Sequence, residues 1–269
     1  MYSKVSGVFS SLSSANSNDR MREIENEITP KITAHFSEIS LNLDLFKRVK
    51  TVYEQRNDLN LNAEQLRLVE VIYRNFQRNG ADLPEEKRAE FKAIRERMAM
   101  ISLNLDQNLL KENAGFKLVI DNEDDLAGLP QDVISSAAEL AKSENLEGKW
   151  VFNLSKPSWI PFLQFSERRD LREKLFTAYF MRGDNNNEYD NKKLFIELIT
   201  LRQKMVEMLG FKNYAEYATA INMAKNPENV YDFLMKVWAP ALDRAKQERD
   251  DMQAIIDTEG GDFKLQSWD

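Results

Sequence analysis

The strongest constraint on the fold is a run of apolar residues spaced three and four apart along one stretch of the chain. The run consists of Phe91, Ile94, Met98, Ile101, Leu105 and Leu109. This spacing places its members on one side of an α-helix, and Pro84 followed by Glu85 and Glu86 is typical of a helix start. Sustained over about 28 residues, the pattern predicts a rod of roughly 40 Å, long enough to pack lengthwise on another helix.

The same spacing recurs along much of the chain and predicts further helices. Their approximate ranges are 21–32, 42–58, 62–80, 166–183, 190–209, 213–220 and 226–260. Asn62 and Gln65 have the spacing of a capping box, as do Asn213 and Glu216. Pro240 is expected to kink the last helix.

The segment 115–165 differs from the rest of the chain in its residue pattern. Residues 116–120 and 149–154 are rich in β-branched and aromatic residues and predict two strands, with a short helix led by Pro130 between them. Residues 159–165 are apolar but contain Pro161, which favours an edge or irregular segment. We therefore predict a mainly α protein with a small β insertion. It divides into a long-helix region 1–114, a small α/β insertion 115–165 and a helical region 166–269.

Composition excludes several classes of function. The formal net charge is -7, with 44 acidic against 37 basic residues, so the chain lacks the positive field that nucleic-acid binding requires. There are no cysteines, which excludes disulfides, thiolate zinc sites and a cysteine nucleophile. No apolar run approaches the roughly 18 residues of a membrane helix, and we expect a soluble chain with no membrane partner.

Motifs that carry chemistry are missing from the sequence. It contains no HExxH, GxSxG, GxxxxGK[ST] or GxGxxG pattern. His35 is the single histidine, and with Glu38 it forms an HxxE pair that falls short of the three ligands a zinc site needs. We interpret His35 as a structural residue, and we expect no catalytic, cofactor-binding or metal-binding residue in this chain.

Two blocks of sequence carry a family resemblance, and two upstream segments add to it. The blocks are residues 166–179, rich in arginine, and residues 201–217 followed by Met223-Ala224-Lys225-Asn226-Pro227; the upstream segments are 39–49 and 125–130. In order and spacing they resemble the amino-terminal part of the zinc metallopeptidases of the thimet oligopeptidase and bacterial peptidyl-dipeptidase family. The resemblance covers essentially all 269 residues.

The resemblance implies a fold and a function. Enzymes of this family are almost wholly helical, with two lobes around a deep channel that holds zinc, and this chain resembles much of one lobe. In these enzymes the HExxH helix and the remaining catalytic residues come after the position that corresponds to Asp269. The resemblance therefore assigns no catalytic role to any residue of this chain. The implied cofactor is zinc in the full-length enzyme and none in this part. The implied partners are the carboxy-terminal catalytic half and short peptides.

Two further expectations concern particular residues. Arg168, Arg169 and Arg172 could bind peptide carboxylates, but we expect them to form ion pairs instead. One face of the long helices should be unusually apolar, because the catalytic half would normally cover it.

Two functions stay open at this level. The first is the inactive amino-terminal region of a zinc oligopeptidase, and the second is a free-standing helical interaction module. The stop soon after Gly260-Gly261 favours a truncated chain. A cytoplasmic location is favoured, with the periplasm as the alternative.

Overall fold

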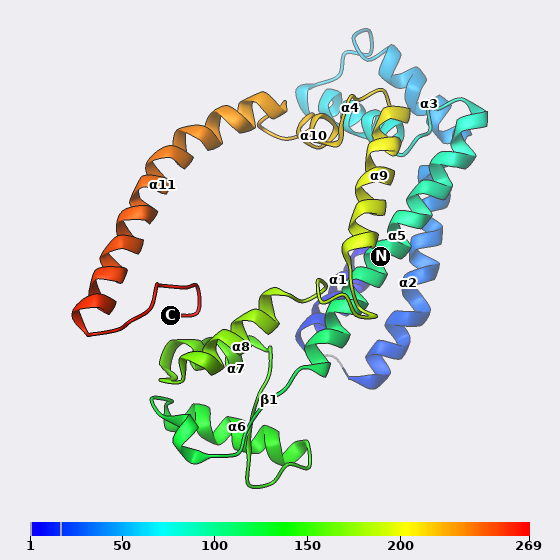
Figure 1. The fold of residues 1–269 in the computed structure, drawn as a ribbon. Helices are drawn as coiled ribbons and strands as arrows, with labels where there is room; N and C mark the ends of the chain where they lie inside the picture. Colours follow the sequence, from blue (N-terminus) through cyan, green and yellow to red (C-terminus); the bar gives the residue numbers. More distant parts are fainter. Residues whose placement is uncertain (1, 17) are drawn as a thin grey trace. The chain divides into compact units, whose positions relative to one another are not determined.

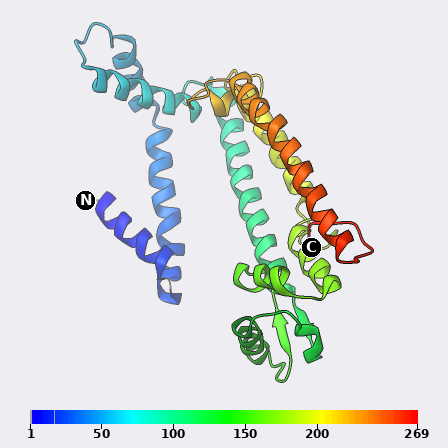
Figure 2. The same cartoon turned by 90° about the vertical axis from the view of Figure 1, so that its left-hand side faces the viewer.

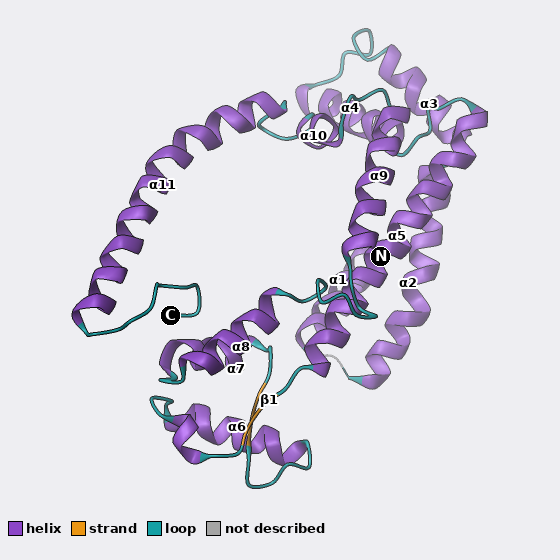
Figure 3. Ribbon diagram, viewed as in Figure 1, coloured by secondary structure: helices purple, strands orange, loops and turns teal. Residues whose placement is uncertain are grey.

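The computed structural model describes residues 2–16 and 18–269, which are mainly helical (Figures 1 and 3). The helices are α1 Tyr2–Ala15, α2 Asp19–Ser40, α3 Leu43–Glu54, α4 Ala63–Arg78, α5 Glu85–Gly115, α6 Gln131–Ser143, α7 Lys156–Phe165, α8 Arg169–Phe180, α9 Lys192–Met208, α10 Tyr214–Thr219 and α11 Pro227–Thr258, with a 3-10 turn at Glu123–Leu126. The strands are β1 Leu118–Ile120 and β2 Trp150–Phe152. The predicted fold class, mainly α with a small sheet, is confirmed. No helix in the described ranges is long and apolar enough to cross a membrane.

The chain separates into two compact units, and each is described by itself. The first contains the residues up to 93 together with 208–210, and the second contains 94–207 and 211–269. The division into regions 1–114, 115–165 and 166–269 stays a prediction.

In the first unit, α3 and α4 pack through a small aromatic core. Phe46, Phe76 and Ala81 are buried there, and the rings of Phe46 and Tyr73 stack with centroids 5.9 Å apart. The predicted capping box at the start of α4 is confirmed. The Asn62 side chain accepts a hydrogen bond from the backbone N–H of Gln65, and the Gln65 side chain accepts one from the backbone N–H of Asn62. Gly80 follows the helix with φ +85°, the left-handed conformation that suits glycine.

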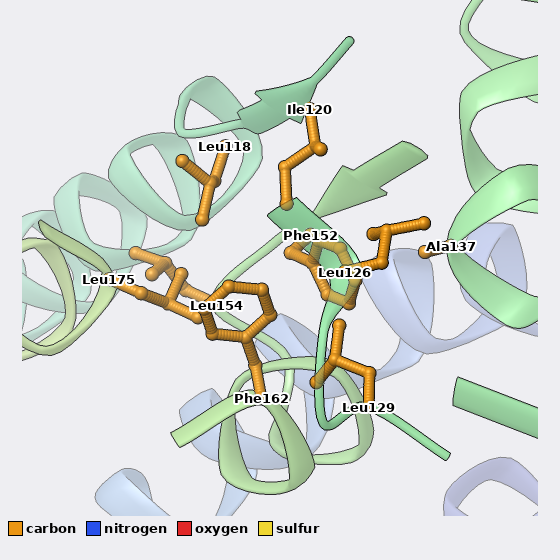
Figure 4. Close-up of a cluster of buried hydrophobic side chains, with 9 residues drawn as sticks. All are labelled: Leu118, Ile120, Leu126, Leu129, Ala137, Phe152, Leu154, Phe162 and Leu175. Atoms are coloured by element: carbon orange, nitrogen blue, oxygen red, sulfur yellow. The ribbon is translucent and has the colours of Figure 1, made fainter. Parts of the chain in front are cut away.

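The core of the second unit forms around the small sheet (Figure 4). β1 and β2 pair antiparallel, with Leu118 opposite Phe152 and Ile120 opposite Trp150. The buried side chains come from both strands, the 3-10 turn, α6, α7 and α8. They are Leu118, Ile120, Leu126, Leu129, Ala137, Phe152, Leu154, Phe162 and Leu175. The insertion predicted from the sequence is therefore the site of the largest cluster of buried apolar side chains in this unit.

The second half of α5 packs against α9. Ile101 and Leu105 of α5 are buried together with Leu198 of α9. Beside them, the Arg97 guanidinium makes two hydrogen bonds of 2.6 and 2.7 Å to the Glu197 carboxylate. Met98, Ile101 and Leu105 of the apolar row that predicted a long rod thus face another helix.

One prediction about local structure was wrong. Residues 156–165 form the helix α7 and are not an edge or irregular segment, although Pro161 lies inside the helix. Pro157 occupies its first turn, where a missing N–H costs nothing, and Pro161 removes only one internal hydrogen bond. Burial of Phe162 in the core, where it is 0% exposed, outweighs that loss.

The first and last helices can be compared with those predicted from the sequence. α1 had no counterpart among the predicted helices. α11 begins after Asn226 as predicted and runs unbroken through Pro240 to Thr258, bowed along its length in Figure 1.

Candidate functional site

Metal-binding chemistry is not assembled in the described residues. Among them, no group of three or more His, Asp or Glu side chains is arranged to hold an ion. His35 lies exposed on α2, with its ring 5.7 Å from that of Phe36. The Glu38 side chain of the HxxE pair lies outside the described residues. The expectation that this chain has no site residues stays a prediction.

The three arginines at the start of α8 are committed to partners within the chain. Arg168 pairs with Asp125 and also donates to Asp170 at 2.8 and 2.9 Å. Arg169 makes two hydrogen bonds to Asp269, of 2.8 and 3.0 Å. The expectation of ion pairing is confirmed.

The end of the chain, marked C in Figure 2, is fastened to α8. Arg172 makes this attachment together with Arg169. Its guanidinium donates to the Trp268 carbonyl at 2.8 Å, the Ser166 carbonyl at 2.7 Å and the Asp269 carboxylate at 3.2 Å. The side chain of Asp269 is only 6% exposed. Burial acts to raise its pKa, but hydrogen bonds from Arg169, the Gln266 amide and Arg172 outweigh burial and hold the pKa below its usual value. Arg169 and Arg172 thus bind the carboxylate of Asp269, a residue of this chain.

A second built cluster surrounds Glu112 on α5, which is 8% exposed. Its carboxylate accepts hydrogen bonds from the Gly183 amide, from Asn185 at 2.9 Å and from Asn187 at 2.7 Å. Gly183 has φ +77°, and a Cβ at this position would come within 2.9 Å of the Asn191 side chain. One buried carboxylate therefore organises the asparagine-rich loop between α8 and α9.

The charge of Glu112 is favoured by these hydrogen bonds. Burial acts to raise the pKa of its carboxyl, and nearby Asp190 does the same, but the bonds from Asn185, Gly183 and Asn187 lower the pKa below its ordinary value. Sequence reasoning missed this cluster. Its only signal was the run of asparagines after Gly183, which carries no information about a partner some 70 residues earlier.

Two hollows lie in the second unit. The first, of about 450 Å³, lies between α6, β2 and α7. In its lining the Ser158 hydroxyl accepts from the Asn153 amide, and the Ser155 hydroxyl donates to Asn153 Oδ1. The second, of about 590 Å³, lies where residues 261–264 fold back beside the end of α11. There the Gln253 side chain donates to the Phe263 carbonyl.

The most unusual surface belongs to α11. Every residue from 231 to 252 is exposed, and the helix has no buried residue. Its large apolar side chains are concentrated in the first half. The exposed ones in that half are Tyr231, Phe233, Leu234, Met235, Val237, Trp238 and Leu242, and Met252 and Ile255 are exposed in the second half. Trp238 is 58% exposed and Phe233 67%. This agrees with the expectation of an unusually apolar face on a long helix, and we take it as the candidate functional surface.

Comparison with known proteins shows what this chain is similar to. The model of peptidase family M3 matches residues 162–269, which include α8, α9, α10 and α11. The dipeptidyl carboxypeptidase of Escherichia coli (strain K12) is 33% identical over 269 residues, which is 100% of this chain and 40% of that enzyme. Oligopeptidase A of the same organism is 29% identical over 264 residues, covering 97% of this chain and 39% of the enzyme.

The similarity also extends to eukaryotic relatives. A thimet-like oligopeptidase of Dictyostelium discoideum is 26% identical over 246 residues, covering 88% of this chain and 35% of that protein. The chain thus spans well under half the length of these relatives. The resemblance stated from the sequence is confirmed: this chain is a relative of the dipeptidyl carboxypeptidases and oligopeptidases of peptidase family M3 and corresponds to their amino-terminal part.

Proposed function

We propose that this chain is the non-catalytic, helical amino-terminal region of a zinc-dependent oligopeptidase or peptidyl-dipeptidase that hydrolyses short peptides. By itself the chain is inactive. Its partner is the carboxy-terminal catalytic half of the enzyme, which supplies the HExxH helix and the zinc.

The observation that carries the proposal is the alignment of the whole chain with 40% of a dipeptidyl carboxypeptidase. A relationship along the entire length supports a shared fold and a shared task. A helical lobe contributes to peptide hydrolysis by exclusion and positioning: one wall of a channel admits extended peptides and holds them in place. The opposite wall provides a metal-activated water.

The residues of this chain support the assignment of the chemistry to the other half. A catalytic zinc site takes about three protein ligands, most often histidines when cysteine is absent. The sequence has one histidine and no cysteine. Carboxylates alone favour harder ions such as magnesium and calcium.

A free-standing helical interaction module is the alternative. It is favoured only by the extensive exposed apolar surface of α11, which could receive an unrelated partner. Reading the gene beyond the codon for Asp269 separates the two hypotheses. An in-frame HExxH supports the enzyme region, and a stop codon at that point supports the module.

The activity test compares this chain with a longer chain that continues through the rest of the gene. Each is incubated with zinc and a quenched fluorescent peptide. We expect hydrolysis only by the longer chain, and a chelator should abolish it. Chelator-sensitive hydrolysis by residues 1–269 alone that disappears in a His35→Ala variant would overturn the proposal.

A further inference from the structure

We infer that the apolar surface of α11 is the place where the catalytic half of the enzyme packs, and that this half contacts α11 from more than one side. The inference rests on the proposed function and adds the location and character of the interface.

The width of the apolar surface gives the first argument. Successive residues of a helix are about 100° apart around its axis. Viewed down α11, the large apolar side chains cover an arc of about 200°, with Phe233 at one edge, Met235 at the other and Trp238 between them. A helix that lies on one layer needs an apolar stripe of roughly 100°. An arc about twice as wide is typical of a helix with neighbours on two sides. Asp232, Lys236 and Asp243 occupy the remaining arc and mark the side that stays in water.

The second argument is that α11 has a capped start and that the segment after it is attached to another element of the same unit. At the amino end, the Asn226 side chain accepts from the Asn229 amide, and the Asn229 side chain donates to the Ala224 carbonyl. At the carboxyl end, Gln253 accepts from the Leu265 amide at 2.8 Å.

The residues after Leu265 are in turn fixed to α8. Asp269 receives the two hydrogen bonds from Arg169, and Arg172 holds the Trp268 carbonyl. Before this attachment, residues 231–252 are exposed throughout. A preformed helix whose following segment is attached to α8 presents its apolar side chains in an ordered arrangement, which lowers the entropic cost of binding.

The identity of the occupant follows from the family comparison. α11 lies entirely within residues 162–269, the part that matches peptidase family M3. The E. coli dipeptidyl carboxypeptidase has most of its length outside the aligned 40%. The occupant is therefore the part of the enzyme that follows in sequence. It should present apolar side chains to Trp238 and Phe233.

The experiment tests binding between two separately produced polypeptides. One is residues 1–269, and the other is the remainder of the enzyme encoded after Asp269. Sedimentation velocity measures their association, and zinc-dependent peptide hydrolysis is measured in parallel. Three forms of residues 1–269 are compared: the unchanged chain, Trp238→Asp and Lys236→Asp. Both substitutions place aspartate at an exposed position of α11, and Lys236→Asp makes the larger change in charge, so it controls for added negative charge and for the introduced residue. Circular dichroism checks that each variant keeps its helix content.

We expect the unchanged chain and Lys236→Asp to bind the remainder. Trp238→Asp should weaken binding at least about tenfold, because a large aromatic residue at the centre of an interface contributes strongly to affinity. Equal binding by Trp238→Asp and Lys236→Asp would overturn the inference and leave the proposed function intact.

Two other outcomes also decide against the inference. If residues 1–269 form a dimer that Trp238→Asp abolishes and the remainder does not bind, the occupant is a second copy of this chain. If the remainder alone hydrolyses peptides at the full rate of the intact enzyme and never binds residues 1–269, the proposed function fails as well. The activity measurement thus distinguishes the two failures.

Discussion

At the scale of single residues, buried carboxylates connect parts of the chain that are far apart in sequence. Glu112 accepts three hydrogen bonds from one loop. Asp269 accepts two hydrogen bonds from the Arg169 guanidinium and one from Arg172. Hydrogen bonds to a charged group are roughly twice as strong as neutral ones. Each carboxylate therefore fixes a segment that has no regular structure of its own.

Replacing Glu112 by glutamine should destabilise the chain. Glutamine retains one acceptor oxygen and turns an amide N–H₂ toward groups that are themselves donors, so bonds from Gly183 or the asparagines are lost. We expect the free energy of unfolding to fall by about 2–3 kcal/mol, measured by urea denaturation at neutral pH. Glu147→Gln, at an exposed position, is the matched control and should change the stability by less than about 0.5 kcal/mol. Equal stability of the two variants would contradict the assigned role of Glu112.

The contribution of Glu112 should also depend on pH. Its pKa is lower in the folded chain than its ordinary value of 4.5. A group with a depressed folded-state pKa stabilises the fold above its unfolded-state pKa and loses this contribution as the pH falls through the folded-state pKa. The stability difference between the unchanged chain and Glu112→Gln should therefore be largest near neutral pH and shrink below pH 4.5. Urea denaturation repeated over this range measures it, and a difference that grows with acidification would show the opposite linkage.

At the scale of elements, α7 shows how packing overrides local preference. Phe162 is fully buried, and its ring meets that of Phe152 edge-on with centroids 4.6 Å apart. Phe165, three residues later, is 42% exposed. The helix thus places two phenylalanines in two different environments, one buried and one partly exposed. Pro161 is tolerated inside the helix because the free energy gained by burying one face outweighs the loss of one hydrogen bond.

Alanine substitutions at these two phenylalanines should separate the environments. Phe162→Ala should lower the free energy of unfolding by about 3–5 kcal/mol, since it leaves a cavity in the cluster around the sheet. Phe165→Ala should cost less than about 1 kcal/mol, because the ring is already half in water. Thermal or urea unfolding of the two variants measures the difference. Similar losses for both would mean that α7 does not bury Phe162 as described.

At the scale of the whole molecule, the part that matches the peptidase family carries exposed apolar side chains on more than one helix. Besides those of α11, the α9 residues Phe195, Ile196 and Ile199 are between 51% and 67% exposed, on the side of α9 away from α5. Large exposed apolar patches mark interaction sites on soluble proteins.

Without a covering partner, residues 1–269 should self-associate. We expect the sedimentation coefficient to rise with protein concentration and a hydrophobic dye to fluoresce when the chain is added, because apolar surface is removed from water on association. Trp238→Asp should reduce both effects, and Lys236→Asp should reduce neither. A monomer at all concentrations with no dye binding would contradict the view of α11 as an uncovered interface.

The sequence by itself determined most helices, the two strands and the family. These depend on local signals, namely three-four spacing, the Asn62–Gln65 capping box and glycines such as Gly80, and local signals act through neighbours a few residues away. Only the tertiary structure decided that residues 156–165 are helical, that Glu112 holds the loop after Gly183, and that Arg169 and Arg172 hold Asp269. In each case the free energy comes from groups about 70 to 100 residues apart or from burial in a shared core. No periodicity in the sequence records such contacts, because they depend on which surfaces the fold brings together.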